Sequence, residues 1–440
     1  MSVAENQNAE IESLSQKAHR LIPGGAHTYA KGDDQYPEQA PAFLVRGAGS
    51  HVWDSEGKEY IEYGMGLRAV TLGHAFPPVV EAVAAQLPLG TNFTRPAPIE
   101  VECAETLLEM LPGVDMAKFC KDGSMAVDGA IRLSRAHTGR DMVAICGDHP
   151  FFSTNDWFIG TTGMSGGIPT WATDKVVKFR YNDLPSLNAL FDQFPNRIAC
   201  VVMEAARTEE PEPGFLEGVK ANAQRCGAVL IFDEMITGFR WDLPGAQQCY
   251  GVEADLATFG KALANGFSVS ALTGRRELME LGGADHNRER VFLLSTTHGA
   301  ETHALAAAIA TIRYYQQNPV VETLYARGRR LREGIQRTVD ELQLARNFVL
   351  VSRDCNLIFG TRDEEGKPSQ PYRTLFMQEL VSRGVIAPSF VVSFSHSEED
   401  IDRTIEVVSD ALAIYRRALD EGIEKYLKSQ SVKPVFRRFA

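Results

Sequence analysis

Residues 226–265 read CGAVLIFDEMITGFRWDLPGAQQCYGVEADLATFGKALAN and contain two apolar runs that predict buried β-strands. The first run, 228–232, leads directly into Asp233, and the second, 255–259, leads through one glycine into Lys261. In an open parallel sheet, ligands bind at the carboxyl ends of the strands. The stretch therefore predicts that an acid and an amine are presented to one cavity.

On both sides of this stretch, strand-like and helix-like segments alternate. Further strands are predicted at 118–120, 140–146, 175–179, 199–204 and 269–273, and helices at 126–138, 187–194, 218–225 and 301–317. Such alternation is typical of a mainly parallel sheet with helices on both faces. The predicted fold class is therefore α/β.

The two ends of the chain have a different pattern. Three short strands between residues 43 and 63, separated by GAGS and SEGK, predict a small antiparallel meander. After about residue 330, two strands and two long helices predict a smaller α+β domain that packs with this meander. We therefore divide the chain into an N-terminal segment, a large domain and a C-terminal small domain, at 1–70, 71–330 and 331–440.

Composition narrows the function classes. The net charge of −12 argues against a nucleic acid or an anionic membrane surface as the main partner. The seven cysteines include no CxxC pair, so neither a disulfide framework nor a metal site is predicted. The first 25 residues lack the apolar core of a signal peptide, and no run approaches the roughly 20 apolar residues of a membrane span. We expect a cytoplasmic protein.

Two segments that precede helices are candidate anion sites. Gly123 and Ser124 stand between a strand and a helix, where free N–H groups and the helix dipole favour a phosphate. The alternative is an ordinary turn with Ser124 as the helix cap. Asp122 is expected to point away from a phosphate or to cap the helix. Residues 295–300, STTHGA, form the second hydroxyl-rich helix start.

The aspartate and the lysine each have an alternative interpretation. Asp233 could belong to a metal-binding acid pair, but the chain has no GxxxxGK[ST] phosphate loop to accompany it. Lys261 could be a solvated lysine, yet it is expected to open a helix, where the dipole and burial would lower its pKa and favour a nucleophile. A phosphate site, a strand-end acid and a strand-end lysine together predict pyridoxal phosphate (PLP) as cofactor.

The sequence resembles the class III PLP-dependent aminotransferases of fold type I, in particular the glutamate-1-semialdehyde aminomutase-like branch. The resemblance covers nearly the whole chain. It is carried by FLVRGAGSHVWDSEGKEYIEY (43–63), LGHAFPPVVEAV (72–83), LIFDEMITGFR (230–240), TFGKALANGFSVSALTGR (258–275) and HSEEDIDRTIEVV (396–408). It implies that segment 71–330 binds PLP.

The resemblance also implies roles for single residues around the cofactor ring. Lys261 corresponds to the Schiff-base lysine, and Asp233 to the acid that pairs with the pyridine nitrogen. Met235 takes the place of the apolar residue packed on the ring face. Glu204, in VVMEA, corresponds to a family acid near the cofactor, although the usual following proline is Ala205 here.

Further roles concern the phosphate and the assembly. Gly123 and Ser124 are expected to bind the phosphate through backbone and hydroxyl groups. Thr297 is similar to the threonine that reaches the phosphate from the neighbouring subunit, which implies a homodimer with shared active sites.

The chain departs from the family pattern at several positions. The phosphate loop reads Asp-Gly-Ser-Met-Ala in place of Ser-Gly-Thr-Glu-Ala. Where the family has Tyr-His-Gly, whose aromatic ring stacks on the cofactor, this chain has DHP followed by FF, so the stacking residue is His149, Phe151 or Phe152. The mutase's N-terminal Ser-x-x-Arg segment is replaced by residues 27–31, HTYAK, without the arginine.

These departures favour an aminotransferase. The leading hypothesis is transfer from an amino acid donor, with glutamate as candidate, to a carbonyl acceptor such as a keto-sugar or aldehyde of a surface-polysaccharide or secondary-metabolite pathway. The alternatives are intramolecular amino transfer by a mutase and a non-catalytic binding or regulatory protein. Substrate selection is assigned to segments 26–37, 148–170 and 386–396.

Four arginines are candidates for gripping a substrate carboxylate or phosphate. They are Arg46, Arg68, Arg95 and Arg240. For each, the alternative is a surface or interdomain salt bridge. Arg240 is the one most expected to be structural.

Overall fold

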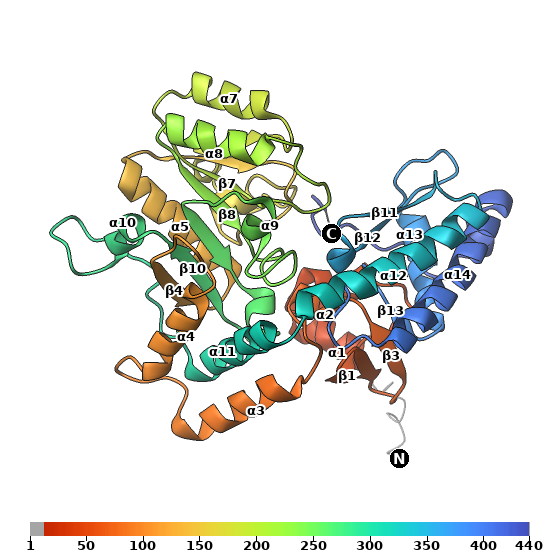
Figure 1. Cartoon of the computed structure of the whole chain (residues 1–440). Coiled ribbons are helices and arrows are strands. Elements are labelled where there is room, and N and C mark those ends of the chain that lie inside the picture. The colour runs from red at the N-terminus through yellow and green to blue at the C-terminus, as the bar shows by residue number, and fades with distance from the viewer. Residues whose placement is uncertain (1–12, 440) are drawn as a thin grey trace, which may run out of the picture.

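The computed structural model describes residues 13–439, and its largest element is a seven-stranded sheet (Figure 1). The strand order is β4-β10-β9-β8-β7-β5-β6. All neighbours pair in parallel except β10, which is antiparallel to both β4 and β9. The strands are β4 (Met116–Cys120), β5 (Met142–Cys146), β6 (Val176–Phe179), β7 (Ile198–Met203), β8 (Val229–Asp233), β9 (Leu256–Phe259) and β10 (Ser270–Gly274). The predicted mainly parallel sheet is confirmed.

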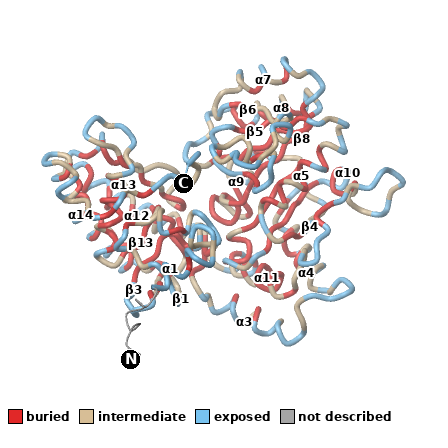
Figure 2. Tube along the Cα trace, turned by 180° about the vertical axis from the view of Figure 1, so that it is seen from behind, coloured by how far each residue is buried: buried red, intermediate tan, exposed pale blue. Residues whose placement is uncertain are grey.

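Helices cover both faces of this sheet because successive strand residues point to opposite sides. Leu230 and Phe232 of β8 pack with helices α7 (Leu184–Gln193) and α8 (Phe215–Arg225). Val229 and Ile231 pack on the other face with α5 (Gly123–Thr138). The strands are apolar on both faces and therefore read as continuous hydrophobic runs, as expected for a sheet buried between helices. Figure 2 shows the resulting concentration of buried residues along β5 and β8.

A third cluster supports the connection between β9 and β10. It joins α3 (Pro77–Gln86), α4 (Pro98–Leu108) and α11 (Thr302–Gln317) to Phe259 and to residues 262–264. Phe259, Leu263 and Ala264 are completely buried there. The segment that carries Lys261 is thus anchored on its helix side by apolar packing.

The second unit is built from both ends of the chain. Strands β1 (Leu44–Ala48), β2 (His51–Asp54) and β3 (Glu59–Glu62) form the antiparallel meander, and β13 (Val385–Ile386) pairs in parallel with β3. The other elements are α12 (Val320–Glu341), β11 (Phe348–Val351), β12 (Ile358–Thr361), α13 (Gln370–Ser382) and α14 (Glu398–Glu421). The predicted packing of the meander with the C-terminal elements is confirmed, whereas boundaries at 70 and 330 stay a prediction.

Polar contacts also join the N-terminal meander to the C-terminal helix α14. His51 Nε2 lies 2.8 Å from Asp400 Oδ1, and the Ser50 hydroxyl donates to the other oxygen of the same carboxylate at 2.8 Å. The hydrogen bond to Asp400 raises the pKa of His51. Residues nearly 350 positions apart are therefore joined by a charge-assisted hydrogen bond.

The remaining helices are short. They are α1 (Leu14–Leu21), α2 (Met65–Arg68), α6 (Asp156–Ile159), α9 (Ala246–Tyr250) and α10 (Arg276–Met279). Among residues 13–439, no helix combines the length and apolar character needed to span a bilayer.

Candidate active site

Lys261 lies in the tight connection between β9 and β10. It begins a four-residue 3₁₀ turn, η6 (Lys261–Ala264), so the predicted helix at this position is wrong. The chain has only residues 260–269 in which to reverse into the antiparallel neighbour β10, which leaves no room for a longer helix. Lys261 has a φ of +46°, in the left-handed region that costs free energy for a residue with a Cβ.

The turn is held from outside by Asn265. Its side chain accepts a hydrogen bond from Leu72 N at 2.9 Å and donates to the carbonyl oxygen of Gly73 at 2.9 Å. Both partners belong to the LGH segment that follows the meander. The left-handed lysine is therefore fixed by hydrogen bonds and by the apolar cluster beneath it.

Asp233 ends β8, the strand next to β9. Its Oδ1 accepts hydrogen bonds from Met235 N at 2.9 Å and from Thr258 Oγ1 at 3.1 Å, and the residue is 5% exposed. Burial raises the pKa of Asp233, while the charge of Lys261 and the two hydrogen bonds oppose that rise. The acid and the amine lie at the same edge of the sheet, as the strand pattern predicts.

The electrostatic surroundings of Lys261 favour a reactive amine. Burial is the main cause that lowers its pKa, and the positive charges of Arg68 and Arg207 act in the same direction. The carboxylates of Asp233 and Glu204 act against this lowering. A lysine that is desolvated and faces other cations is more easily deprotonated and becomes a better nucleophile.

Glu204 follows β7 and is 3% exposed. Its Oε1 lies 3.5 Å from Arg207 Nη1, while its Oε2 is buried without a hydrogen-bond partner in the described chain. Burial raises the pKa of Glu204 to about 7, and the charge of Asp233 adds to the rise. A buried oxygen without a partner is a position where a ligand is expected to donate a hydrogen bond.

His149 is the stacking candidate that the structure places beside these groups. Its Nδ1 accepts a hydrogen bond from Glu204 N at 3.0 Å, and burial lowers its pKa to about 3. The ring is therefore neutral, with its proton on Nε2. Phe152 is buried in the core, and Phe151 is 40% exposed against the rings of Phe158 and Phe436.

The start of α5 is the predicted phosphate loop. Asp122 caps the helix, with its Oδ1 accepting from Met125 N at 3.0 Å, as expected from the sequence. Ser124 is buried, and its hydroxyl accepts from Thr154 N at 3.1 Å. The Asp122 carboxylate thus occupies the amide of Met125, and the amides of Gly123 and Ser124 are the ones at this helix start that could receive a phosphate.

Met235 joins this loop to the lysine turn. A Cβ at Gly123 would lie 2.8 Å from Met235 Sδ, and a Cβ at Gly260 would lie 2.6 Å from it. Both distances are too short for real carbon–sulfur contacts, so glycine is required at each position for Met235 to pack there. The two loops and the segment after Asp233 therefore converge on one side chain.

Thr297 lies on an exposed loop before α11. Its carbonyl oxygen accepts from Asn92 Nδ2 at 3.0 Å. At the end of the loop, Glu301 pairs with Lys121, the residue before Asp122, at 2.5 Å. These contacts place the loop beside the start of α5 within one chain, and the reach of Thr297 into a neighbouring subunit stays a prediction.

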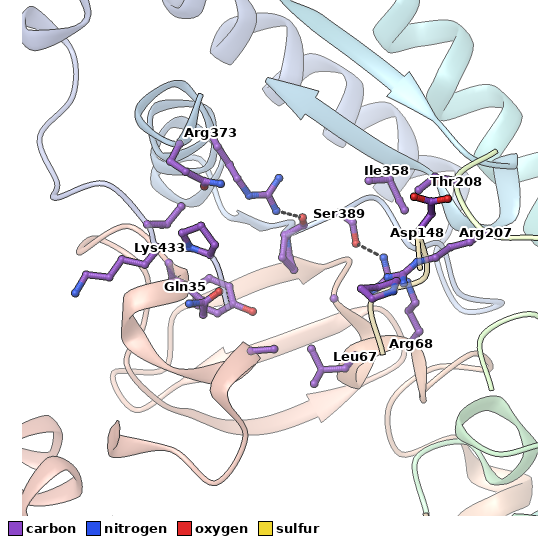
Figure 3. A pocket seen from close by; sticks show the side chains of 18 residues that line it. Gln35, Leu67, Arg68, Asp148, Arg207, Thr208, Ile358, Arg373, Ser389 and Lys433 are labelled. Carbon is purple, nitrogen blue, oxygen red and sulfur yellow. Dashed lines mark hydrogen bonds between the residues drawn. The ribbon is translucent and has the colours of Figure 1, made fainter. Parts of the chain in front are cut away.

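A cavity of about 500 Å³ has Arg68 and Arg207 in its wall, two arginines whose charges lower the pKa of Lys261, while Lys261 itself is not a lining residue (Figure 3). The three segments assigned to substrate selection all contribute to its wall, through Ala30, Gln35, Tyr36, Asp148, Pro150, Pro388 and Ser389. Arg68 also lines it, as one of the four candidate arginines. Arg207, Arg373 and Lys433 were not singled out in the sequence and also line the cavity.

The other three candidate arginines lie elsewhere. Arg240 is completely buried and donates to the carbonyl oxygen of Arg68 at 2.9 Å and to Thr71 Oγ1 at 2.7 Å, so it is structural as expected. Arg46 is exposed over the Trp53 ring, and Arg95 is exposed.

The family model for class-III aminotransferases matches residues 33–412. The chain belongs to this family. It is 30% identical over 421 residues to 3-aminobutyryl-CoA aminotransferase of Cloacimonas acidaminovorans, covering 93% of this chain and 98% of the relative. It is 32% identical over 421 residues to glutamate-1-semialdehyde 2,1-aminomutase of Acetivibrio thermocellus, covering 90% and 96%.

Solved structures agree with this membership. The FumI protein of Sphingopyxis sp. MTA144, determined with PLP, superposes with a TM-score of 0.85 at 27% identity and covers 95% of this chain and 98% of its own. The class-III aminotransferase is therefore an enzyme with the PLP-transferase fold of type I. The predicted family and fold are confirmed.

The residues around Lys261 fit PLP by three observations. The glycines at 123 and 260 let Met235, the residue expected on the ring face, pack between the start of α5 and the lysine turn. Glu204 Oε2 lacks a partner, and the start of α5 offers free amides to a phosphate. Lys261, Asp233, Gly123 and Ser124 would hold the cofactor.

Glu204 gives a first test of this electrostatic arrangement. Its pKa is 4.5 in a model peptide and about 7 in the folded protein, so between these pH values the folded state keeps a proton that the unfolded state loses. Stability therefore falls as the pH rises through this window, by about 3 kcal/mol in total. We expect Glu204→Gln to remove this loss, so that the variant gains about 3 kcal/mol over wild type between pH 4.5 and pH 8.

The measurement is urea unfolding of both apoproteins across that range. The exposed Glu209 provides the matched control, because Glu209→Gln should leave the pH dependence of unfolding unchanged. A Glu204→Gln variant whose stability difference from wild type is the same at pH 5 and pH 8 would contradict the assignment.

Proposed function

We propose that this class-III aminotransferase moves an amino group from an amino acid donor, with glutamate as first candidate, to a separate carbonyl acceptor. The observation that carries the proposal is the cavity of about 500 Å³ whose wall includes Arg68 and Arg207, two arginines whose charges also act on Lys261. Guanidinium groups at this position suit the carboxylate of an amino acid. A volume of this size encloses ligands much larger than glutamate, which suits a second, bulkier substrate.

Pyridoxal 5′-phosphate is the cofactor, and when bound it supplies an electron-accepting ring that eases removal of a proton from the carbon bearing the amino group. Lys261 would hold the cofactor through its amine, and the same amine would move that proton as a general base and acid. Asp233 keeps the ring nitrogen protonated. Gly123 and Ser124 hold the phosphate.

The remaining residues orient the ring. Met235 supports one face, and His149 is the candidate for the other. Phe151, the second stacking candidate, would need to turn inward from its exposed position. Glu204 has a buried oxygen without a partner, which would accept a hydrogen bond from the cofactor.

The mutase reaction is the competing function. Similarity does not separate the two, because one relative is named an aminotransferase and the other an aminomutase, at 30% and 32% identity. The transferase is favoured because segment 27–31, which has no arginine, presents Ala30 to the cavity. A keto-sugar or aldehyde acceptor stays a prediction from the sequence.

A single half-reaction distinguishes the two functions. Mixing the PLP-loaded enzyme with glutamate alone should change the cofactor's absorbance to that of the amine form and release one equivalent of 2-oxoglutarate per site. The Lys261→Ala variant provides the blank. If no free amino acid causes this change, while a single amino-aldehyde reacts without a donor, the mutase function is correct.

We also propose a homodimer in which Thr297 reaches the phosphate of the neighbouring subunit. Apolar side chains on and between α3 and α4 are exposed in the single chain; these are Val80, Leu87, Leu89, Phe93 and Val101. Such a cluster is typical of a surface covered by a partner. Sedimentation of a single 48.5-kDa species at micromolar concentration would overturn the proposal.

The cytoplasm is the proposed compartment. All seven cysteines are free, and five of them are buried. Unpaired thiols are usual where the environment is reducing.

A further inference from the structure

Asp128 follows Ser124 by four residues on α5, and its carboxylate holds the loop that comes after β5. Residues four apart share one face of a helix, so the two side chains face the same loop. The Oδ1 atom of Asp128 accepts hydrogen bonds from Ser153 Oγ at 3.0 Å and from Trp157 Nε1 at 2.7 Å. Its Oδ2 accepts from Asn155 Nδ2. One carboxylate therefore binds three side chains of the loop.

The hydrogen bonds to this carboxylate come from neutral groups. Arg132, four residues further along α5, donates from Nη1 to the carbonyl oxygen of Phe292 at 2.7 Å and not to Asp128. Burial raises the pKa of Asp128, while the three hydrogen bonds and the charge of Arg132 oppose that rise. A partly buried charge without a directly paired cation is costly unless hydrogen bonds compensate for the lost water. The contacts with the loop therefore stabilise the acid at this position.

The same bonds fix the backbone of Thr154. Its neighbours Ser153 and Asn155 both bind Asp128 through their side chains, and Asn155 N also donates to Ser153 Oγ at 3.0 Å. The peptide N–H of Thr154 is thereby directed at Ser124, and it donates to the hydroxyl oxygen at 3.1 Å. Asp128 therefore acts on Ser124 through the backbone of the loop.

The hydrogen bond from Thr154 determines what the Ser124 hydroxyl can do. A hydroxyl group has one hydrogen to donate and two lone pairs that accept. Because the oxygen of Ser124 accepts from Thr154 N, its hydrogen is available for an acceptor at the start of α5, and the accepted bond strengthens the donated one. Serine stands here where the family loop has threonine, whose branched Cβ restricts its rotamers. A bond from outside the helix therefore supplies a restriction that the serine itself lacks.

We propose that Asp128 is a positioning residue of the cofactor site. Through the loop that it holds, it keeps the Ser124 hydroxyl turned toward the phosphate of PLP, without contacting the cofactor itself. The inference rests on the proposed role of Ser124 in holding the phosphate, because Asp128 acts through that hydroxyl. The phosphate site thus extends beyond the start of α5 to the next turn of the helix and to the loop after β5.

The affinity of the apoprotein for PLP, compared with its affinity for pyridoxal, tests this role without turnover. The two ligands share the ring and the aldehyde group, and pyridoxal lacks the phosphate. Ser124→Ala should weaken PLP binding about 10- to 100-fold, the range for a hydrogen bond to a charged group, and leave pyridoxal binding unchanged. Asp128→Ala should show the same selectivity with a loss of about 10-fold, because the hydroxyl is kept but is no longer oriented.

Combining the two substitutions separates positioning from a general structural role. If Asp128 acts through Ser124, the double variant should bind PLP about as weakly as Ser124→Ala alone, whereas independent losses would multiply. Asp128→Asn keeps one acceptor oxygen and should recover part of the affinity. Trp157→Phe removes one donor to Asp128 and should lower the preference for PLP in the same direction, which keeps the test valid if Asp128→Ala does not fold. Asp156→Ala, at an exposed acid of the same loop, is the matched control and should change neither affinity.

Three results would overturn the positioning role. One is a loss in Asp128→Ala that is equal for PLP and pyridoxal, which would indicate general damage to the loop. Another is a pair of losses that multiply in the double variant. The third is an unchanged preference for PLP in Ser124→Ala, since the phosphate would then be held elsewhere. None of these measurements depends on amino transfer, so a failed half-reaction with glutamate would reject the proposed donor and leave the role of Asp128 intact.

Discussion

Replacing Lys261 with alanine is expected to abolish amino transfer, with a loss in kcat of at least about 10²–10⁴-fold, the contribution of a positioned acid–base group alone. Lys261 is the residue of the site with an amine that can attach to the cofactor, and its surroundings keep that amine easily deprotonated. The loss of covalent attachment adds to the loss of proton transfer. Binding of the cofactor through the start of α5 should remain.

Borohydride reduction gives a readout independent of turnover. In the wild-type enzyme it should add the mass of the reduced cofactor to the peptide that contains Lys261, and in Lys261→Ala it should add none. Lys261→Arg separates charge from chemistry, because it keeps a cation but cannot form the bond. Lys118→Ala, at an exposed lysine of β4, should retain both labelling and activity. Labelling at another lysine in the wild type would refute the assignment.

The sequence predicts the pair at the centre of this site because the relevant signals are local. Asp233 and Lys261 each follow an apolar run, and a parallel sheet places the ends of neighbouring strands at one edge. Asp122 could also be interpreted correctly, since a carboxylate before a helix commonly caps it. For these residues, the neighbours in sequence are enough to indicate the role.

The local sequence pattern does not predict features that depend on contacts between segments far apart in the chain. The helix expected at Lys261 is a short turn because β10 runs antiparallel to β9 and the connection is brief, a property of topology. Arg373 and Lys433 lie 60 residues apart in sequence and line the same cavity, and a hydrogen bond between their neighbours Val432 and Thr374 joins the two segments. Nothing near either residue marks it as part of a cavity. Arg207 could have been noticed, since it follows Glu204 by three residues at the end of a buried strand.

The second large effect is expected for Asp233→Asn, which should lower kcat/KM about 10²–10³-fold, as when one preorganised electrostatic partner is removed. Asparagine has nearly the same shape, and its Oδ1 can still accept from Met235 N and Thr258 Oγ1. The fold around the site should therefore persist. What is lost is the negative charge that keeps the ring nitrogen protonated.

Glu234, the next residue along the chain, provides the matched control. Its carboxylate is completely engaged in structure, accepting from Ala246 N and Gln247 N at 2.9 Å each. Glu234→Gln should lower the free energy of unfolding and leave kcat/KM of the folded fraction nearly unchanged, the reverse of Asp233→Asn. A cofactor analogue with a permanently positive, N-methylated ring should restore activity to Asp233→Asn and not improve the wild type. If the analogue gives no recovery, Asp233 acts through packing and not through its charge.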